Sequence, residues 1–315
     1  MGAATTTPAT FHHEALFYAG DEEFVERCRA FVEEGLDHHE PVLVIVGSGK
    51  LELLREALGE RADQAHFADM EVVGRNPARI IPAWGRFVAD HSQGAVGGPM
   101  RGIGEPIWAD RKPDELVECQ LHESLLNLAF AADEFQLICP YDTTALPDDV
   151  IAAARRSHPI VSATGVPEAC GDYCGLENVA AHFSEDLAEP PAGAEELRVT
   201  LDGLREARGL VRRHAEDAGL GERADDFVLA VNEVLSNSLY HAHDDGELRI
   251  WNDPDGLVCE VRDGGWISQP LVGREEPPAG QVGGHGIWLV NLVCDLVQVR
   301  SSEHGSTVRM RMTHA

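Results

Sequence analysis

The stretch that decides the fold of the C-terminal half is Phe227-Val-Leu-Ala-Val-Asn-Glu-Val-Leu-Ser-Asn-Ser-Leu-Tyr240. Its apolar residues recur with the period of an α-helix, so Glu233 and Asn237, one turn apart, are expected on the same face. Three glycine-containing motifs follow in order: Asp263-Gly-Gly265, Gly283-Gly-His-Gly286 and Gly305-Ser-Thr307. A carboxylate and an amide one turn apart can share a metal-bound triphosphate. Together the four motifs predict a site for ATP and Mg²⁺.

Each motif has a predicted role in that site. Asn237 would bind Mg²⁺ through its amide oxygen, and Glu233 would orient or deprotonate the attacking nucleophile. Asp263 would accept a hydrogen bond from the adenine amino group, and Gly265 would let the backbone approach the base. The other predicted nucleotide-binding residues are Gly283, Gly284, Gly286 and Thr307. The triphosphate is expected at the start of a helix over 287–293, where unpaired backbone N–H groups favour an anion.

This order of motifs resembles the GHKL superfamily of ATPases and kinases, and residues 198–315 are similar to its anti-sigma-factor serine kinase branch. The branch-level resemblance rests on Gly283-Gly-His-Gly-Ile-Trp-Leu-Val-Asn-Leu-Val-Cys-Asp295, followed by a strand and Gly305-Ser-Thr-Val308. One position departs, because the second motif of the family reads Asp-x-Gly-x-Gly and Ile267 stands at its last position here. The resemblance implies a Bergerat-type α/β sandwich with protein serine/threonine kinase activity.

In that branch the kinase sequesters a sigma factor and phosphorylates an anti-anti-sigma partner of the STAS type. The resemblance therefore implies a cytoplasmic regulator of transcription without direct contact with nucleic acid. The composition agrees, since 54 acidic against 25 basic residues give a net charge of -29 that would repel a phosphate backbone. No signal peptide or membrane span is predicted. The oligomeric state is left open, with a homodimer as one option.

The N-terminal half alternates strand-like and helix-like segments, which predicts an α/β domain with a largely parallel sheet. The predicted strands are 14–18, 42–46, 66–67, 100–103 and 135–139, and the predicted helices are 22–36, 49–58, 77–91, 113–131 and 148–156. The expected organisation is a disordered start over 1–11, a domain over 12–160, a connector over 161–197 and the ATP-binding domain over 198–315.

Four segments of this half are distinctive: His12-His-Glu-Ala-Leu-Phe-Tyr18, Gly104-Glu-Pro-Ile-Trp108, the helix with Glu123 and Asn127, and Cys139-Pro-Tyr-Asp142. They resemble the MEDS (methanogen/methylotroph, DcmR sensory) domain. That resemblance implies a RecA-like α/β core that senses a small-molecule ligand. Polar residues near strand ends, where open α/β sheets place ligand sites, define a candidate sensory pocket. They are His13, Glu105, Trp108, His122, Glu123, Cys139, Tyr141 and Asp142. The alternative is that Trp108 and Tyr141 are half-buried packing residues, and that His13 and His122 are histidines satisfied at the surface or in the core.

The seven cysteines predict reduced thiols rather than disulfides, because Cys139, Cys259 and Cys294 lie inside apolar patterns and no secretory signal is present.

Three functions are compatible with these features. The first is a protein serine/threonine kinase controlled by a sensory domain. The second is a non-catalytic regulator that binds protein partners in an ATP-dependent way. The third is a sensor histidine kinase-like protein, which requires a phospho-accepting histidine on a two-helix hairpin before the ATP-binding domain. The connector has too little helical periodicity for such a hairpin, and no heptad surrounds His182.

Overall fold

The computed structural model describes residues 11–92, 98–241, 246–278 and 284–314. The contacts divide the chain into two units, each with its own sheet. Unit 1 comprises 1–74 and 83–179, and unit 2 comprises 75–82 and 180–315. None of the described helices is long and apolar enough to cross a membrane.

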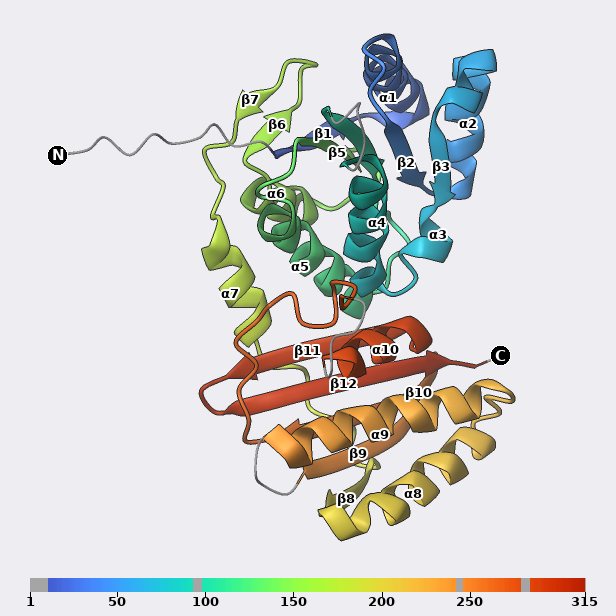
Figure 1. Cartoon of the computed structure of the whole chain (residues 1–315), viewed down its shortest axis with the longest axis vertical. Coiled ribbons are helices and arrows are strands. Elements are labelled where there is room, and N and C mark those ends of the chain that lie inside the picture. The colour runs from blue at the N-terminus through green and yellow to red at the C-terminus, as the bar shows by residue number, and fades with distance from the viewer. Residues whose placement is uncertain (1–10, 93–97, 242–245, 279–283, 315) are drawn as a thin grey trace, which may run out of the picture. The chain divides into compact units, whose positions relative to one another are not determined.

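Unit 1 is built on a seven-stranded sheet in the order β3-β2-β4-β5-β1-β6-β7 (Figure 1). Its strands are β1 (His12–Tyr18), β2 (Val42–Val46), β3 (His66–Asp69), β4 (Met100–Gly104), β5 (Phe135–Asp142), β6 (Ile160–Ser162) and β7 (Glu168–Ala169). All neighbours pair in parallel except β6 and β7. Strand β2 is apolar and buried throughout, as expected of a parallel strand covered on both faces. The predicted parallel α/β fold is confirmed.

Helices cover both faces of this sheet. They are α1 (Gly20–Asp37), α2 (Ser48–Leu58), α3 (Met70–Val73), α4 (Ile80–Ser92), α5 (Pro113–Ala129) and α6 (Asp148–Ser157), with the 3₁₀ turn η1 (Gly59–Gln64). The 3₁₀ turn η2 (Pro77–Arg79) belongs to unit 2. Helices α1 and α2 share a core with Leu16, Val44 and Ile103 on one face. The intervening residues of the same strands point to the other face of the sheet, which α5 and α6 cover. His13 and Cys139 are among them. Helix α6 has acidic residues in its first turn and basic residues in its last, which matches the helix dipole.

The predicted connector over 161–197 contains regular structure. Strand β6 extends the first sheet beside β1, and β7 pairs with β6. Helix α7 (Leu176–Ser184) follows, and β8 (Glu195–Val199) already belongs to the second sheet. These elements have between two and nine residues. Such lengths are too short for a hydrophobic period to stand out, which explains the weak pattern in the sequence.

Unit 2 is built on a five-stranded antiparallel sheet in the order β11-β12-β10-β9-β8 (Figure 1). The other strands are β9 (Gly246–Asp253), β10 (Gly256–Asp263), β11 (Leu296–Ser302) and β12 (Gly305–Thr313). The turn η3 (Leu201–Gly203) leads into α8 (Leu204–Asp217), followed by α9 (Arg223–His241) and, later, α10 (His285–Val293). The helices share one core with Leu248, Cys259 and Met310 of the sheet. The predicted α/β sandwich is confirmed.

All seven cysteines are free thiols, and Cys139, Cys259 and Cys294 are buried, as predicted.

Candidate functional site

Glu233 and Asn237 lie one turn apart on α9, and both are half-buried. The start of α10 comes close to them. A Cβ atom at Gly286 would lie 2.7 Å from Asn237 Nδ2 and 3.4 Å from Glu233 Oε2, so only glycine permits this approach without moving the amide. The motif that contains Gly286 therefore packs against the helix that carries Glu233 and Asn237. The carboxylate of Glu233 and the amide of Asn237 lie beside the start of α10.

Helix α10 begins at His285, two residues before the predicted start. Its N-cap residue Gly284 has a φ of 82°, a conformation that glycine adopts readily. No side chain of the described residues caps the first turn. The uncapped N–H groups and the helix dipole give this turn an affinity for anions such as phosphate. Gly283, also predicted to bind the nucleotide, lies outside the described residues.

Asp263 ends β10 on the face that packs against the helices. This follows from strand alternation, because Leu257, Cys259 and Val261 of the same strand belong to the core shared with the helices. The backbone N–H of Gly265 donates a hydrogen bond of 2.7 Å to Asp263 Oδ1. Oδ1 of Asp263 is thus occupied by a hydrogen bond within its own motif, whereas Oδ2 has no hydrogen bond to any described residue. Asp263 is therefore placed to accept one further hydrogen bond.

Two serines hold the loop after Asp263. Ser306 pairs with Asp263 across β10 and β12, and Ser301 pairs with Ser306 across β12 and β11. The Ile267 N–H donates to Ser301 Oγ at 2.8 Å, the two serine hydroxyls are 2.8 Å apart, and Ser306 Oγ donates to the Gly265 carbonyl at 2.9 Å. Although Ile267 replaces a glycine of the family motif, its backbone is fixed in this network.

Thr307, also predicted to bind the nucleotide, lies on the face of β12 that points away from the helices. Along β12, Val308, Met310 and Met312 face the helices, so Ser306 shares their face and Thr307 points to the opposite one. Thr307 pairs with Arg262 and Arg300. Of these two adjacent hydroxyl residues, Ser306 is therefore the one on the face of Glu233 and Asn237.

We expect Ser306→Ala to lower ATP affinity by about 2- to 10-fold, the loss typical of one neutral hydrogen bond. Thr307→Ala, the matched control on the other face of β12, should stay within about twofold of the parent, since it removes no contact of the Gly265 loop. Calorimetric titration of both variants with ATP tests this. Equal losses in the two variants would contradict the placement.

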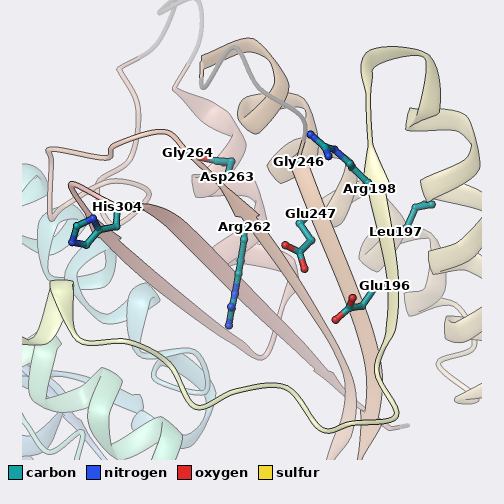
Figure 2. A pocket seen from close by; sticks show the side chains of 9 residues that line it. All are labelled: Glu196, Leu197, Arg198, Gly246, Glu247, Arg262, Asp263, Gly264 and His304. Atoms are coloured by element: carbon teal, nitrogen blue, oxygen red, sulfur yellow. The ribbon is translucent and has the colours of Figure 1, made fainter.

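The opposite face of the same sheet carries a shallow depression (Figure 2). It is lined by Glu196, Leu197, Arg198, Gly246, Glu247, Arg262, Asp263, Gly264 and His304. Two of its charged side chains pair with residues beside it: Arg262 Nε lies 2.7 Å from Glu260 Oε1, and Glu196 Oε1 lies 3.1 Å from Arg249 Nε. The lining of the depression includes neither Glu233 nor Asn237, although it reaches Asp263 at the end of β10.

The eight residues predicted to form a sensory pocket divide between the two faces of the first sheet. On the α5 and α6 face, His13, Glu123 and Cys139 are brought together and are almost completely buried. They are joined by His158, the C-cap of α6, which is not among the residues predicted to form the pocket. Tyr141 is buried nearby, with its ring centroid 5.7 Å from that of His158. His122 is buried on α5.

The remaining residues lie at the carboxyl ends of β4 and β5. Glu105 accepts a hydrogen bond of 2.7 Å from the Tyr18 hydroxyl and pairs with Lys50 at 2.5 Å. Burial raises the pKa of Glu105, although Lys50 opposes that shift. The other two have separate partners. Trp108 stacks with the guanidinium of Arg111, and Asp142 Oδ1 accepts hydrogen bonds from Thr144. Ligand binding by the buried residues on the α5 and α6 face, or by the residues at the carboxyl ends of β4 and β5, remains a prediction.

The buried group has unusual electrostatics. Burial, together with the neighbouring His158, lowers the pKa of His13 to about 4. Burial alone would raise the pKa of Glu123, but the two adjacent imidazoles of His13 and His158 hold it well below its ordinary value. Burial raises the pKa of the Cys139 thiol, and Glu123 adds to the effect. A buried carboxylate therefore faces a neutral imidazole and a neutral thiol.

Comparisons with known proteins agree with both units. Residues 12–159 match the model of the MEDS domain, the methanogen/methylotroph, DcmR sensory domain. Residues 197–312 match the model of the histidine kinase-like ATPase domain. No curated protein is significantly similar to the chain. The chain thus carries a sensory MEDS domain and an ATP-binding, kinase-like domain, which confirms the two resemblances at that level.

Proposed function

We propose that this chain is a sensory regulator that binds Mg·ATP in its C-terminal domain and transfers the γ-phosphoryl group to a serine or threonine of a protein partner. The observation that carries the proposal is the meeting of Glu233, Asn237 and the start of α10 around Gly286. A pure nucleotide-binding module needs no carboxylate at this point. The proposed partner is an anti-anti-sigma protein of the STAS type, with a sigma factor as the protein that the chain sequesters in the cytoplasm.

The residues present fit a magnesium-bound triphosphate. Asn237 supplies the neutral oxygen ligand that Mg²⁺ accepts beside phosphate oxygens and water, and Gly286 leaves room that any side chain would fill. Bound Mg²⁺ would neutralise negative charge on the phosphates. The N–H groups at the start of α10 would orient the phosphates, and Asp263 would fix the adenine.

Glu233 is the proposed general base. It would accept the proton of the partner's hydroxyl as that oxygen forms a bond to the γ-phosphorus. The bond between the γ-phosphorus and the bridging oxygen breaks, and ADP leaves with the electron pair. Incubation of the chain with labelled ATP and STAS-type proteins encoded in the same genome tests the reaction, and label on a partner serine or threonine is the expected result.

Histidine kinase activity is compatible with the same nucleotide-binding fold, but the segment before it gives this function less support. Between 160 and 197, a segment described throughout, the only helix is the nine-residue α7. Two long helices would be needed to present a histidine on a dimerisation hairpin.

Asn237→Ala is expected to weaken ATP binding about 10-fold or more when Mg²⁺ is present, and much less when a chelator removes the metal, because the lost group acts through the ion. Asn232→Ala on the same helix is the control and should behave like the parent. Calorimetry across a series of Mg²⁺ concentrations measures this, and a loss independent of Mg²⁺ would argue against Asn237 as the metal ligand.

A further inference from the structure

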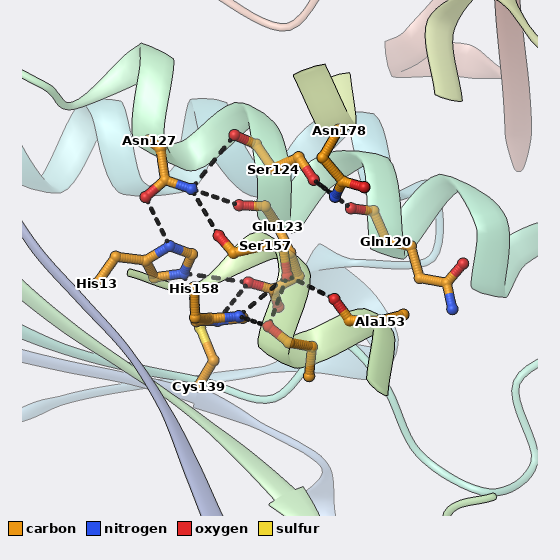
Figure 3. Close-up of polar contacts among 11 residues, drawn as sticks. His13, Gln120, Glu123, Ser124, Asn127, Cys139, Ala153, Ser157, His158 and Asn178 are labelled. Atoms are coloured by element: carbon orange, nitrogen blue, oxygen red, sulfur yellow. Dashed lines mark hydrogen bonds and ion pairs between the residues drawn. The ribbon is translucent and has the colours of Figure 1, made fainter. Parts of the chain in front are cut away.

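Four side chains converge in the interior of unit 1, outside the ATP site (Figure 3). They are His13 of β1, Glu123 of α5, Cys139 of β5 and His158 after α6, and each exposes 1% of its surface or less. One donor atom from each lies within 4.8 Å of the others. Among the described residues, no other group of three or more such side chains is this compact.

Three of the six separations between the donor atoms are close to the edge length of a metal-centred tetrahedron, and all six lie within 4.8 Å. Glu123 Oε2 lies 3.2 Å from His13 Nε2 and 3.3 Å from His158 Nε2, and Cys139 Sγ lies 3.5 Å from His13 Nε2. Bonds of about 2.0–2.3 Å from zinc to nitrogen, oxygen and sulfur place tetrahedral ligands about 3.3–3.8 Å apart. An ion of that size therefore fits between these atoms with small side-chain movements.

Both imidazoles have their second nitrogen fixed as a hydrogen-bond donor. His158 Nδ1 lies 2.8 Å from the carbonyl oxygen of Ala154, which can only accept. His13 Nδ1 lies 3.1 Å from Asn127 Oδ1, and the orientation of that amide is set because its nitrogen donates to three backbone carbonyls. Each Nε2 therefore presents a lone pair to the centre of the group, as in histidine ligands oriented by an outer partner.

The group is also incompletely satisfied by hydrogen bonds. Glu123 Oε1 and His158 Nε2 are buried, and neither has a hydrogen-bond partner in the described part of the chain. Glu123 Oε2 lies 3.3 Å from His158 Nε2, which is within hydrogen-bonding distance. It does not lie along the direction of an N–H bond at Nε2, so the two atoms form no hydrogen bond. Buried polar groups without partners are costly, and a carboxylate facing two lone pairs is repelled unless a cation lies between them.

We propose that His13, Glu123, Cys139 and His158 bind one zinc ion in a closed tetrahedral site. Two imidazoles, one thiolate and one carboxylate form a donor set suited to zinc, with Cys139 deprotonated on binding. Because the protein would supply all four ligands, the ion would join β1, α5, β5 and the end of α6 and stabilise the sensory domain. This inference does not depend on the proposed kinase activity.

The test uses the purified full chain, reduced, stripped of metal, and titrated with Zn²⁺ and with Co²⁺ as a spectroscopic probe. We expect one ion per chain, a higher thermal midpoint with zinc, and the visible bands of tetrahedral cobalt with a thiolate-to-metal band in the near ultraviolet. Cys139→Ser should remove the thiolate band, and His158→Gln should lower metal affinity at least about 100-fold. Asn127→Leu, which alters a positioning residue, should keep the bands but weaken binding about 10- to 100-fold.

Cys170→Ser with Cys174→Ser is the matched control, because those thiols lie outside the group and one of them is exposed. This double variant should bind metal like the parent. Circular dichroism and ATP binding show whether each variant is folded. A folded parent that binds no ion, or a thiolate band that is lost with Cys170 and Cys174 and kept in Cys139→Ser, would overturn the proposal. The parent titration decides the question even if a ligand variant does not fold.

Discussion

Glu233→Gln is expected to lower the rate of phosphoryl transfer to the protein partner by about 10²- to 10⁴-fold, with little change in ATP affinity. The amide is nearly the same size as the carboxylate, so the contact with Gly286 is preserved. It cannot accept the proton of the attacking hydroxyl. Single-turnover transfer of labelled phosphate, measured beside calorimetric ATP binding, separates the two effects.

Glu206→Gln is the matched control. Glu206 is exposed on α8 and belongs to none of the site motifs, so the variant removes the same charge and should leave the rate of transfer unchanged. Transfer by Glu233→Gln at the parent rate would exclude Glu233 as the base. If the parent binds ATP and partner but transfers nothing, the non-catalytic, ATP-dependent binding function takes the place of the kinase.

The sequence predicted the features that rest on a pattern repeated over many residues. The apolar repeat from Phe227 to Tyr240 placed Glu233 and Asn237 on one face of α9, and the alternation of strand-like and helix-like segments predicted the parallel sheet of unit 1. These patterns are local, and many residues contribute to each. Short elements such as β6 and β7 have no such repeat and were included in the predicted connector.

Contacts between distant segments could not be predicted in this way. His158 lies 35 positions after Glu123, and only the packing of α5 and α6 on β1 and β5 brings the two together. Ser306 could have been preferred over Thr307, because strand alternation with Val308 and Met310 predicts its face. The approach of Gly286 to Asn237 depends on how α9 and α10 pack, which neither helix determines alone.

Asp263→Asn is expected to lower ATP affinity by about 10- to 100-fold, the range for a hydrogen bond to a charged group. The reason lies in the Gly265 N–H, which donates to one carboxylate oxygen at 2.7 Å. In the variant the amide oxygen must remain with that N–H, so the amide nitrogen would face the adenine amino group. Two donors would then oppose each other, and rotation of the amide would only move the conflict to Gly265.

The same geometry predicts a change in base preference. Inosine triphosphate carries a carbonyl oxygen where ATP carries the amino group, so the side-chain amide nitrogen introduced by Asp263→Asn could donate to it. The ratio of ATP affinity to inosine triphosphate affinity should therefore fall by more than the ATP affinity alone. Calorimetry with both nucleotides measures the ratio, and Asp253→Asn at the end of β9 serves as the control. An equal loss for the two nucleotides would show that Asp263 does not contact the base, whereas an inverted preference would place its free oxygen against the adenine amino group.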